Sequence, residues 1–263
     1  MRRTDAGGDI GAVPRDTWGE IADAAADLLL GGACAGCARP GRVLCPDCAR
    51  TLPAAARPAW PDPVPAGLAP PWATGEYAGA LRALVIGHKE RRLLGLRDPL
   101  ARLLLQSVRA ALADAPPGPV VLVPVPSRPG VSRTRGHDPT GRITSRAARL
   151  LRRDGLDVLA MPLLRSRPGA VDQAGLGAVA RAANLAGSMH CPTEQVRRLA
   201  ARRTHAHLVV CDDVVTTGVT LREAQRALEA VGLQVAAVAA VAATRRRIPT
   251  GQARPLSSAD PSD

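Results

Sequence analysis

The residues best suited to chemistry lie in the stretch CDDVVTTGVTL at 211–221, directly after the apolar run at 207–210. Its two neighbouring carboxylates, Asp212 and Asp213, repel each other unless a partner holds them. Sugar hydroxyls can do so as hydrogen-bond donors, and a divalent cation can do so through its charge. Because ligands bind beyond the carboxyl ends of parallel strands, we expect the two acids to bind a diol, a cation or both at such an edge.

Hydroxyl side chains and a glycine follow the two acids and open the next predicted helix, which runs over 221–231. The free N–H groups and the dipole at the start of a helix stabilise an anion. A glycine at this point lets the backbone fold tightly. The residues of this predicted phosphate loop are Thr216, Thr217, Gly218 and Thr220. Acids for hydroxyl groups at one end and a phosphate site at the other match a ribose 5-phosphate.

The stretch VVCDDVVTTGVTL resembles the phosphoribosyl pyrophosphate binding motif of the type I phosphoribosyltransferases. In that motif two acids follow a hydrophobic strand and precede a Thr/Gly phosphate loop. The resemblance implies that the ligand is phosphoribosyl pyrophosphate or a related ribose phosphate, bound together with Mg²⁺. The alternative is an ordinary buried strand followed by a polar turn and a capped helix, which leaves both acids and both threonines without a role.

A second segment, PVVLVPVP at 119–126, resembles the strand and Pro-containing loop of such enzymes whose backbone faces pyrophosphate. The resemblance implies that Pro124, Val125 and Pro126 contact the ligand. A basic loop follows, and guanidinium groups pair well with phosphate oxygens. The alternative for its arginines is an ordinary solvated surface. The loop contains Arg128, Arg133 and Arg135, and the predicted catalytic set is Arg133, Arg135, Asp212 and Asp213.

Four cysteines form two C-x₂-C pairs separated by seven residues. Each pair can hold one side of a tetrahedral ion, and together the pairs supply the four sulfur ligands of a structural zinc site. Because sulfur fills every ligand position, we expect the Zn²⁺ to be structural and not catalytic. The predicted ligands are Cys34, Cys37, Cys45 and Cys48. Cys191 and Cys211 lie outside this pattern, and Cys211 is interpreted as a small buried residue.

A four-cysteine knuckle before a phosphoribosyltransferase-like domain is similar to the ComF family, which is associated with DNA uptake in naturally competent bacteria. Further similarities are YAGALRALVIGHK at 77–89, Arg135-Gly136, and the set Gln173, Arg181 and Asn184. On spacing alone, the favoured interpretation of this set is a loop glutamine and two polar residues of a solvated helix, and the resemblance gives a role in the site equal weight. The chain departs from the family at His137-Asp138-Pro139, where the family has Phe-Asn-Gln, which adds a carboxylate beside the expected phosphate site.

Apolar runs alternate with helical patterns from residue 75 onward, which predicts an α/β domain with a mainly parallel sheet flanked by helices. The resemblance implies the type I phosphoribosyltransferase fold. We expect strands within 119–126, 158–164, 207–213 and 233–245, and helices within 81–114, 141–153, 176–186 and 221–231.

The domain organisation follows from changes in composition along the chain. An amphipathic helix at 16–30 and the cysteine knuckle form a first module over 16–52. A Pro/Ala-rich linker without regular structure is expected over 53–74, before the α/β domain at 75–245. A basic, then Pro- and Ser-rich tail at 246–263 is expected to be disordered.

Composition and charge restrict the class of protein. The 263 residues are 46% hydrophobic, enough for the core of one α/β domain, and no apolar run reaches the roughly 18 residues of a membrane span. We therefore expect a cytoplasmic protein. The net charge of +12 favours anionic partners, but only 2% of residues are aromatic, which disfavours stacking on single-stranded nucleic acid. His88 and His137 are interpreted as surface histidines.

Two functions remain in view from the sequence. The first is a Mg²⁺-dependent phosphoribosyltransferase. The second is a non-catalytic sugar-phosphate sensor or adaptor that contacts single-stranded DNA or the proteins of DNA uptake. The altered loop at 137–139 favours the second, whereas the intact acid and threonine motif fits both.

Overall fold

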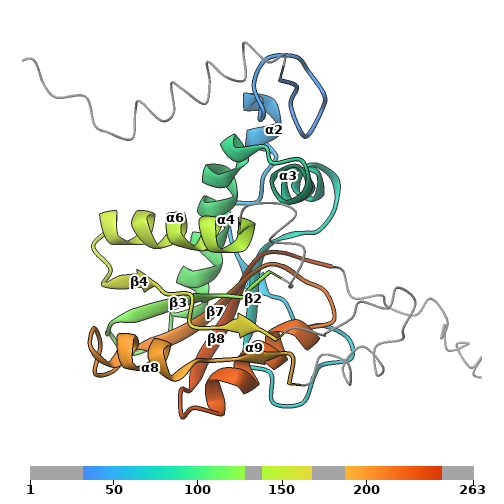
Figure 1. The fold of residues 1–263 in the computed structure, drawn as a ribbon. Helices are drawn as coiled ribbons and strands as arrows, with labels where there is room; N and C mark the ends of the chain where they lie inside the picture. The colour runs from blue at the N-terminus through green and yellow to red at the C-terminus, as the bar shows by residue number, and fades with distance from the viewer. Residues whose placement is uncertain (1–31, 128–137, 168–186, 245–263) are drawn as a thin grey trace, which may run out of the picture.

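A six-stranded, mainly parallel sheet forms the centre of the protein (Figure 1). The computed structural model describes residues 32–127, 138–167 and 187–244. Only the first strand runs antiparallel to its neighbour. In spatial order the strands are β1 (Arg57–Pro58), β2 (Pro71–Glu76), β8 (Val235–Ala243), β7 (His207–Val215), β3 (Val120–Pro124) and β4 (Val158–Ala160).

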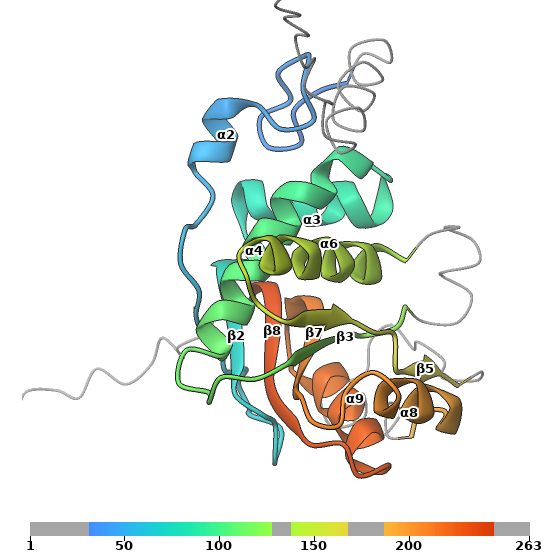
Figure 2. The same cartoon turned by 90° about the vertical axis from the view of Figure 1, so that its left-hand side faces the viewer.

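Helices cover both faces of this sheet (Figures 1 and 2). One face packs against α3 (Gly79–Glu90), α4 (Arg97–Ala111) and α6 (Pro139–Arg153), with the short 3₁₀ helix η1 (Leu94–Leu96) before α4. The other face packs against α8 (Thr193–Ala200) and α9 (Val219–Glu229). A separate antiparallel pair consists of β5 (Arg165–Ser166) and β6 (Met189–His190). The predicted α/β fold with a mainly parallel sheet is confirmed.

The central strand β7 divides its side chains between the two layers. Successive side chains of a strand point to opposite faces. Val209 and Cys211 belong to the core beneath α3, α4 and α6, whereas Leu208 and Val210 belong to the core beneath α8 and α9. These four residues are buried, as expected for a strand that is covered on both faces. Cys211 is therefore a core residue, as predicted.

The cysteine-containing segment rests on the helix α3 side of the molecule. A short helix, α2 (Pro46–Arg50), lies at this end in Figures 1 and 2. Val43 is part of the same core cluster as α3 and α4, and Ala35 packs against that cluster. The small module is thus continuous with the core of the α/β domain.

The stretch expected to be an irregular linker contains strands. Both β1 and the first residues of β2 lie within 53–74, so the expected lack of regular structure is wrong there. Pairing with β8 sets this strand, because an Ala- and Pro-rich segment has little strand propensity of its own. The division of the chain into four segments stays a prediction. The expected helices at 16–30 and 176–186 and the tail at 246–263 lie wholly or largely outside the described residues.

Among the described residues, no helix has the length and apolar character needed to cross a bilayer.

Candidate functional site

A cavity of about 470 Å³ opens beyond the carboxyl ends of β3 and β7. Parallel sheets bind their ligands at this edge. Its walls come from α3, from the segment after β3, from the start of α6, and from the end of β7 with the turn and the helix start that follow it. They include Tyr77, Lys89, Val125, Pro126, Ser127, Thr140, Asp212, Asp213, Thr216 and Thr220. We call this space the carboxylate cavity. The predicted pair of acids and two of the three predicted threonines meet in it.

The carboxylate of Asp213 forms an ion pair with Lys89 of α3. The Lys89 Nζ to Asp213 Oδ2 distance is 2.5 Å. Asp213 continues the alternation of Val209 and Cys211, so its side chain points to the α3 side of the sheet. The residue Asp213 is only 6% exposed, but the Lys89 side chain keeps 38% of its surface accessible. The ion pair therefore belongs to the wall of the cavity and not to the closed core.

The environment of the neighbouring Asp212 disfavours the ionised form of its carboxyl group. Burial raises the pKa of its carboxyl group well above the usual value, and the negative charge of Asp213 raises it further. Lys89 and the backbone N–H of Asp213 act in the opposite direction, and this N–H donates to Asp212 Oδ1 over 2.8 Å. A ligand that brings positive charge or hydroxyl donors would stabilise the ionised form of this carboxyl group.

The turn after β7 contains a glycine in a backbone conformation that other residues rarely adopt. Gly218 has φ 72° and stands immediately before α9, in the left-handed region that favours glycine. A Cβ at this position would lie 2.9 Å from the side chain of Pro61. Thr216 and Thr220 line the carboxylate cavity, whereas Thr217 and Gly218 lie outside its lining.

The loop after β3 meets the same cavity over part of its predicted length. Val125 and Pro126 line it, whereas Pro124 lines a neighbouring cavity. The other predicted residues of this region fall outside the described residues: Arg128, Arg133, Arg135, His137, Gln173, Arg181 and Asn184.

The unusual Asp138-Pro139 sequence has a local structural role. Asp138 is the N-cap of α6, and its Oδ1 accepts a hydrogen bond from the backbone N–H of Gly141 over 3.0 Å. Pro139 occupies the first turn, where its missing N–H costs nothing. The carboxylate that departs from the family pattern thus caps a helix and does not line the carboxylate cavity.

The four predicted zinc ligands converge. The sulfur atoms of Cys34, Cys37, Cys45 and Cys48 all lie within 4.8 Å of one another. Tetrahedral zinc with Zn–S bonds of about 2.3 Å places its sulfur ligands about 3.8 Å apart. The Cys37 and Cys45 sulfur atoms are 3.7 Å apart. The donor set and its spacing therefore fit a structural Zn²⁺.

Backbone N–H groups prepare one of these sulfur atoms to be a thiolate. Although burial raises the pKa of Cys34, backbone N–H groups of Cys45, Cys37 and Gly36 outweigh it and lower the pKa to about 6. The Cys45 N–H to Cys34 Sγ distance is 3.3 Å. A metal-binding cysteine must lose its proton, so these N–H groups favour the metal-binding form of Cys34, whereas the hydrogen bond with Cys45 raises the pKa of Cys48 to about 12.

A comparison with protein-family models supports the interpretation of the carboxylate cavity. Residues 165–255 match the model of the phosphoribosyl transferase domain. The matched range contains β7, the turn after it and α9, and therefore both acids and the threonines. It begins after β3 and does not reach the cysteine module. No curated protein matches the chain.

Sequence reasoning missed two features of this region. Lys89, the only lysine of the chain, was noted as part of the segment at 77–89 but was given no role. Its uniqueness and its place at the end of the segment at 77–89 were the available signals. The expectation that His88 lies at the surface is wrong, because this residue is 1% exposed and lies on the buried face of α3. Its burial follows from its place on the same helical face as Leu81, Leu84 and Val85.

Proposed function

We propose that this protein binds phosphoribosyl pyrophosphate in the carboxylate cavity and transfers its phosphoribosyl group to an acceptor. The observation that carries the proposal is the meeting of two acids, a Thr/Gly turn and a helix start at one edge of a parallel sheet. The match of residues 165–255 to the phosphoribosyl transferase domain supports it.

In this proposal, different residues of the carboxylate cavity bind different groups of the ligand. Asp212 and Asp213 accept hydrogen bonds from the ribose hydroxyls, and Thr216 and Thr220, with the N–H groups that open α9, bind the 5-phosphate. The segment Val125–Ser127 faces the pyrophosphate. Displacement at the anomeric carbon builds positive charge on the sugar and negative charge on the departing pyrophosphate. Positioning and electrostatic stabilisation therefore supply the catalysis, and no covalent nucleophile is needed.

Lys89 adds a positive charge that sequence reasoning did not place. Its ammonium group lies at the wall of the carboxylate cavity, 2.5 Å from Asp213. We propose that it holds the Asp213 carboxylate in place before the ligand arrives and then shares its charge with the pyrophosphate oxygens. Burial lowers the pKa of Lys89, but Asp213 and Asp212 outweigh it and raise the pKa, so the ammonium form is secured at neutral pH.

Mg²⁺ fits the chemistry of this donor set. Two adjacent carboxylates, one with a pKa raised by burial and by the charge of the other, gain from a divalent cation nearby. Bound with the ligand, Mg²⁺ would neutralise charge on the pyrophosphate. Asp212 and Asp213 are the residues that would hold it, directly or through water.

The finer assignment rests on resemblance. The four-cysteine cluster and the segments at 77–89 and 135–136 support a ComF-type protein, and with it a cytoplasmic location and a link to DNA uptake. The four cysteines would bind a structural Zn²⁺ in this proposal.

Pyrophosphate release is the direct test of transfer. The purified chain is incubated with phosphoribosyl pyrophosphate, Mg²⁺ and a panel of nucleobases and amines. Release that depends on one acceptor and is lost in Asp212→Asn/Asp213→Asn supports the enzyme. Binding without release across the panel would instead assign the cavity to a sugar-phosphate sensor.

A further inference from the structure

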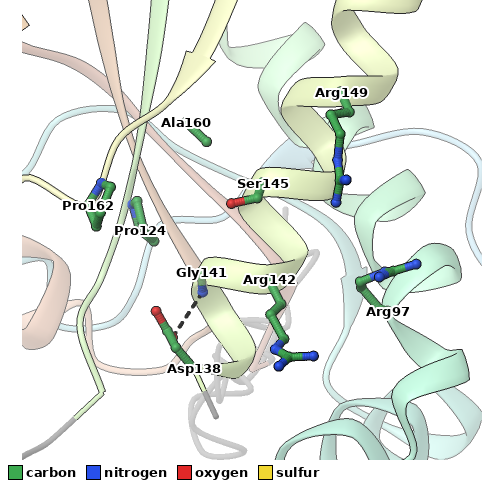
Figure 3. Close-up of a pocket in the computed structure, with 9 residues that line it drawn as sticks. All are labelled: Arg97, Pro124, Asp138, Gly141, Arg142, Ser145, Arg149, Ala160 and Pro162. Carbon is green, nitrogen blue, oxygen red and sulfur yellow. Dashed lines mark hydrogen bonds between the residues drawn. The ribbon is translucent and has the colours of Figure 1, made fainter.

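A second cavity, lined by arginines, lies beside the carboxylate cavity (Figure 3). Its volume is about 240 Å³. Four elements build it: the start of α4, the exposed face of α6 and the ends of β3 and β4. The lining residues are Arg97, Pro124, Asp138, Gly141, Arg142, Ser145, Arg149, Ala160 and Pro162. We call it the arginine cavity.

The polar side of this cavity comes from one face of a helix. Arg142, Ser145 and Arg149 are spaced three and four residues apart on α6, so their side chains project from the same face. Arg97 approaches from the start of α4. Figure 3 shows the three guanidinium groups on the side of α6 that faces α4.

The positive charge of this cavity is not balanced by the acids around it. Asp98 accepts from Arg97 Nε over 2.9 Å and from the buried Arg146 over 2.5 Å, so its two oxygens are already engaged. Arg142 and Arg149 form no hydrogen bond or ion pair with any residue that the structure describes.

Among the lining residues of this cavity, Asp138 carries the one carboxylate, and this group is turned to the start of α6. It accepts from the N–H of Gly141, as described above. Partial burial lowers the pKa of Arg149, the nearby charges of Arg146 and Arg97 lower it further, and the charge of Asp98 acts in the opposite direction. A bound anion would relieve the repulsion among these guanidinium groups.

The two cavities are neighbours but have different walls. Pro124 lines the arginine cavity, whereas the next residue, Val125, lines the carboxylate cavity. In the same way Thr140 faces the carboxylate cavity and Gly141 faces the arginine cavity. The end of β3 and the first turn of α6 therefore separate the two cavities.

We propose that the arginine cavity binds a phosphoryl group of a second ligand, separate from the ribose phosphate in the carboxylate cavity. Guanidinium groups pair with phosphate oxygens through two parallel N–H donors, and Arg142, Arg149 and the free nitrogens of Arg97 supply such donors around one space. Ser145 adds a hydroxyl donor. The volume suits one phosphoryl group with a small substituent, and the apolar floor of Pro124, Ala160 and Pro162 suits the carbon atoms of a phosphate ester.

The test uses inorganic phosphate as the probe, with methyl phosphate as the corresponding ester, in calorimetric titrations of the full chain. Arg142→Gln/Arg149→Gln should weaken phosphate binding at least about tenfold, because two charge-assisted contacts are lost. Arg102→Gln, at an exposed arginine of α4 outside the cavity, is the matched control and should leave the affinity unchanged. Tighter binding of methyl phosphate than of phosphate would point to an ester, and the reverse to free phosphate.

The phosphate loop of the other cavity must be excluded as the source of the signal. Thr216→Val/Thr217→Val should retain phosphate binding at the arginine cavity. Loss of all phosphate binding in this variant, or equal affinity in the double arginine variant and the unaltered chain, would overturn the proposal. This test is independent of the proposed transfer reaction. If Asp212→Asn/Asp213→Asn left the binding of phosphoribosyl pyrophosphate unchanged, the proposed function would fail, but the phosphate site in the arginine cavity would still stand.

A second readout does not depend on altered chains. Phosphate should slow the reaction of Arg142 and Arg149 with an arginine-selective dicarbonyl, followed by peptide mass spectrometry, while Arg102 reacts at the same rate. Equal protection of all three, or of none, would contradict the site.

Discussion

Replacing the two neighbouring acids one at a time should change stability in opposite directions. Asp212→Asn should stabilise the protein at pH 7, because burial and the charge of Asp213 raise the pKa of the Asp212 carboxyl group. An acid with a raised pKa favours the folded state below its unfolded pKa of about 3.9, and this contribution is lost as the pH rises through the folded pKa. The amide oxygen of asparagine can still accept the N–H of Asp213.

Asp213→Asn should destabilise the protein, because it removes the partner of Lys89. Breaking a fully buried ion pair costs about 3–5 kcal/mol, whereas an exposed pair contributes about 0–1 kcal/mol. Here the carboxylate side chain is 8% exposed and that of Lys89 is 38% exposed, so we expect a loss of about 1–3 kcal/mol. The expected gain for Asp212→Asn is about 1 kcal/mol, in the range that stabilising substitutions commonly reach.

Thermal unfolding of the two variants measures this difference. A change of about 1 kcal/mol in the free energy of unfolding shifts the midpoint by roughly 2–4 °C in a chain of this size, so the two midpoints should lie on opposite sides of the unaltered one. Asp154→Asn is the control, because Asp154 pairs with Arg109 in an exposed salt bridge and should shift the midpoint little.

The pH dependence gives a second check on the same pair. The pKa of Lys89 is raised in the folded state, so its contribution is present below its unfolded pKa of about 10.4 and is lost as the pH rises through the folded value. The stability gap between the unaltered chain and Asp213→Asn should therefore narrow at alkaline pH. Equal destabilisation by both asparagine variants at pH 7 would refute the assignment of a costly Asp212 and a paired Asp213.

The remaining predictions concern the turn, the core and the metal site. Gly218→Ala should cost about 1–2 kcal/mol of stability and weaken ligand binding, because φ is 72° and the new Cβ would lie 2.9 Å from the side chain of Pro61. Denaturant unfolding measures the stability and calorimetric titration the binding. An unchanged unfolding midpoint would contradict the prediction. Ser107→Ala should lower the free energy of unfolding by about 1–2 kcal/mol, because the buried Ser107 hydroxyl donates to the Ala240 carbonyl over 2.7 Å and contacts the Thr74 hydroxyl at 2.8 Å. In the same urea titration, Ser145→Ala at an exposed position should leave the free energy of unfolding nearly unchanged. Cys37→Ser should reduce the zinc content from about one ion per chain, whereas Cys191→Ser should leave it unchanged. Elemental analysis of the purified proteins measures this content, and equal zinc in both variants would contradict the four-cysteine zinc site.

The sequence was sufficient to predict an element or a cluster where its local residue pattern agrees with the topology of the fold. The apolar run at 207–210 was predicted to be a buried strand, and β7 covers it. Asp212 and Asp213 were expected at the carboxyl edge of the parallel sheet, and both line the cavity there, while their role in binding stays a prediction. The cysteine spacing likewise predicted a cluster that the structure brings together.

The sequence was insufficient where pairing between distant segments decides the outcome. Strand β2 exists because it pairs with β8, about 165 residues away, and its Pro- and Ala-rich composition gave no sign of it. Lys89 reaches Asp213 only through the packing of α3 on the sheet, a contact between residues 124 positions apart. The arginine cavity also depends on contacts between distant segments, because Arg97 of α4 lies beside Arg142 and Arg149 of α6 only in the folded chain.

Calorimetric titration with phosphoribosyl pyrophosphate and Mg²⁺ tests the central claim most directly. The unaltered chain should bind this ligand at one site, and Asp212→Asn/Asp213→Asn should abolish the binding heat while the circular dichroism spectrum stays that of a folded protein. Undiminished affinity in the double variant, or no binding by the unaltered chain, would contradict the assignment of the carboxylate cavity to a ribose phosphate.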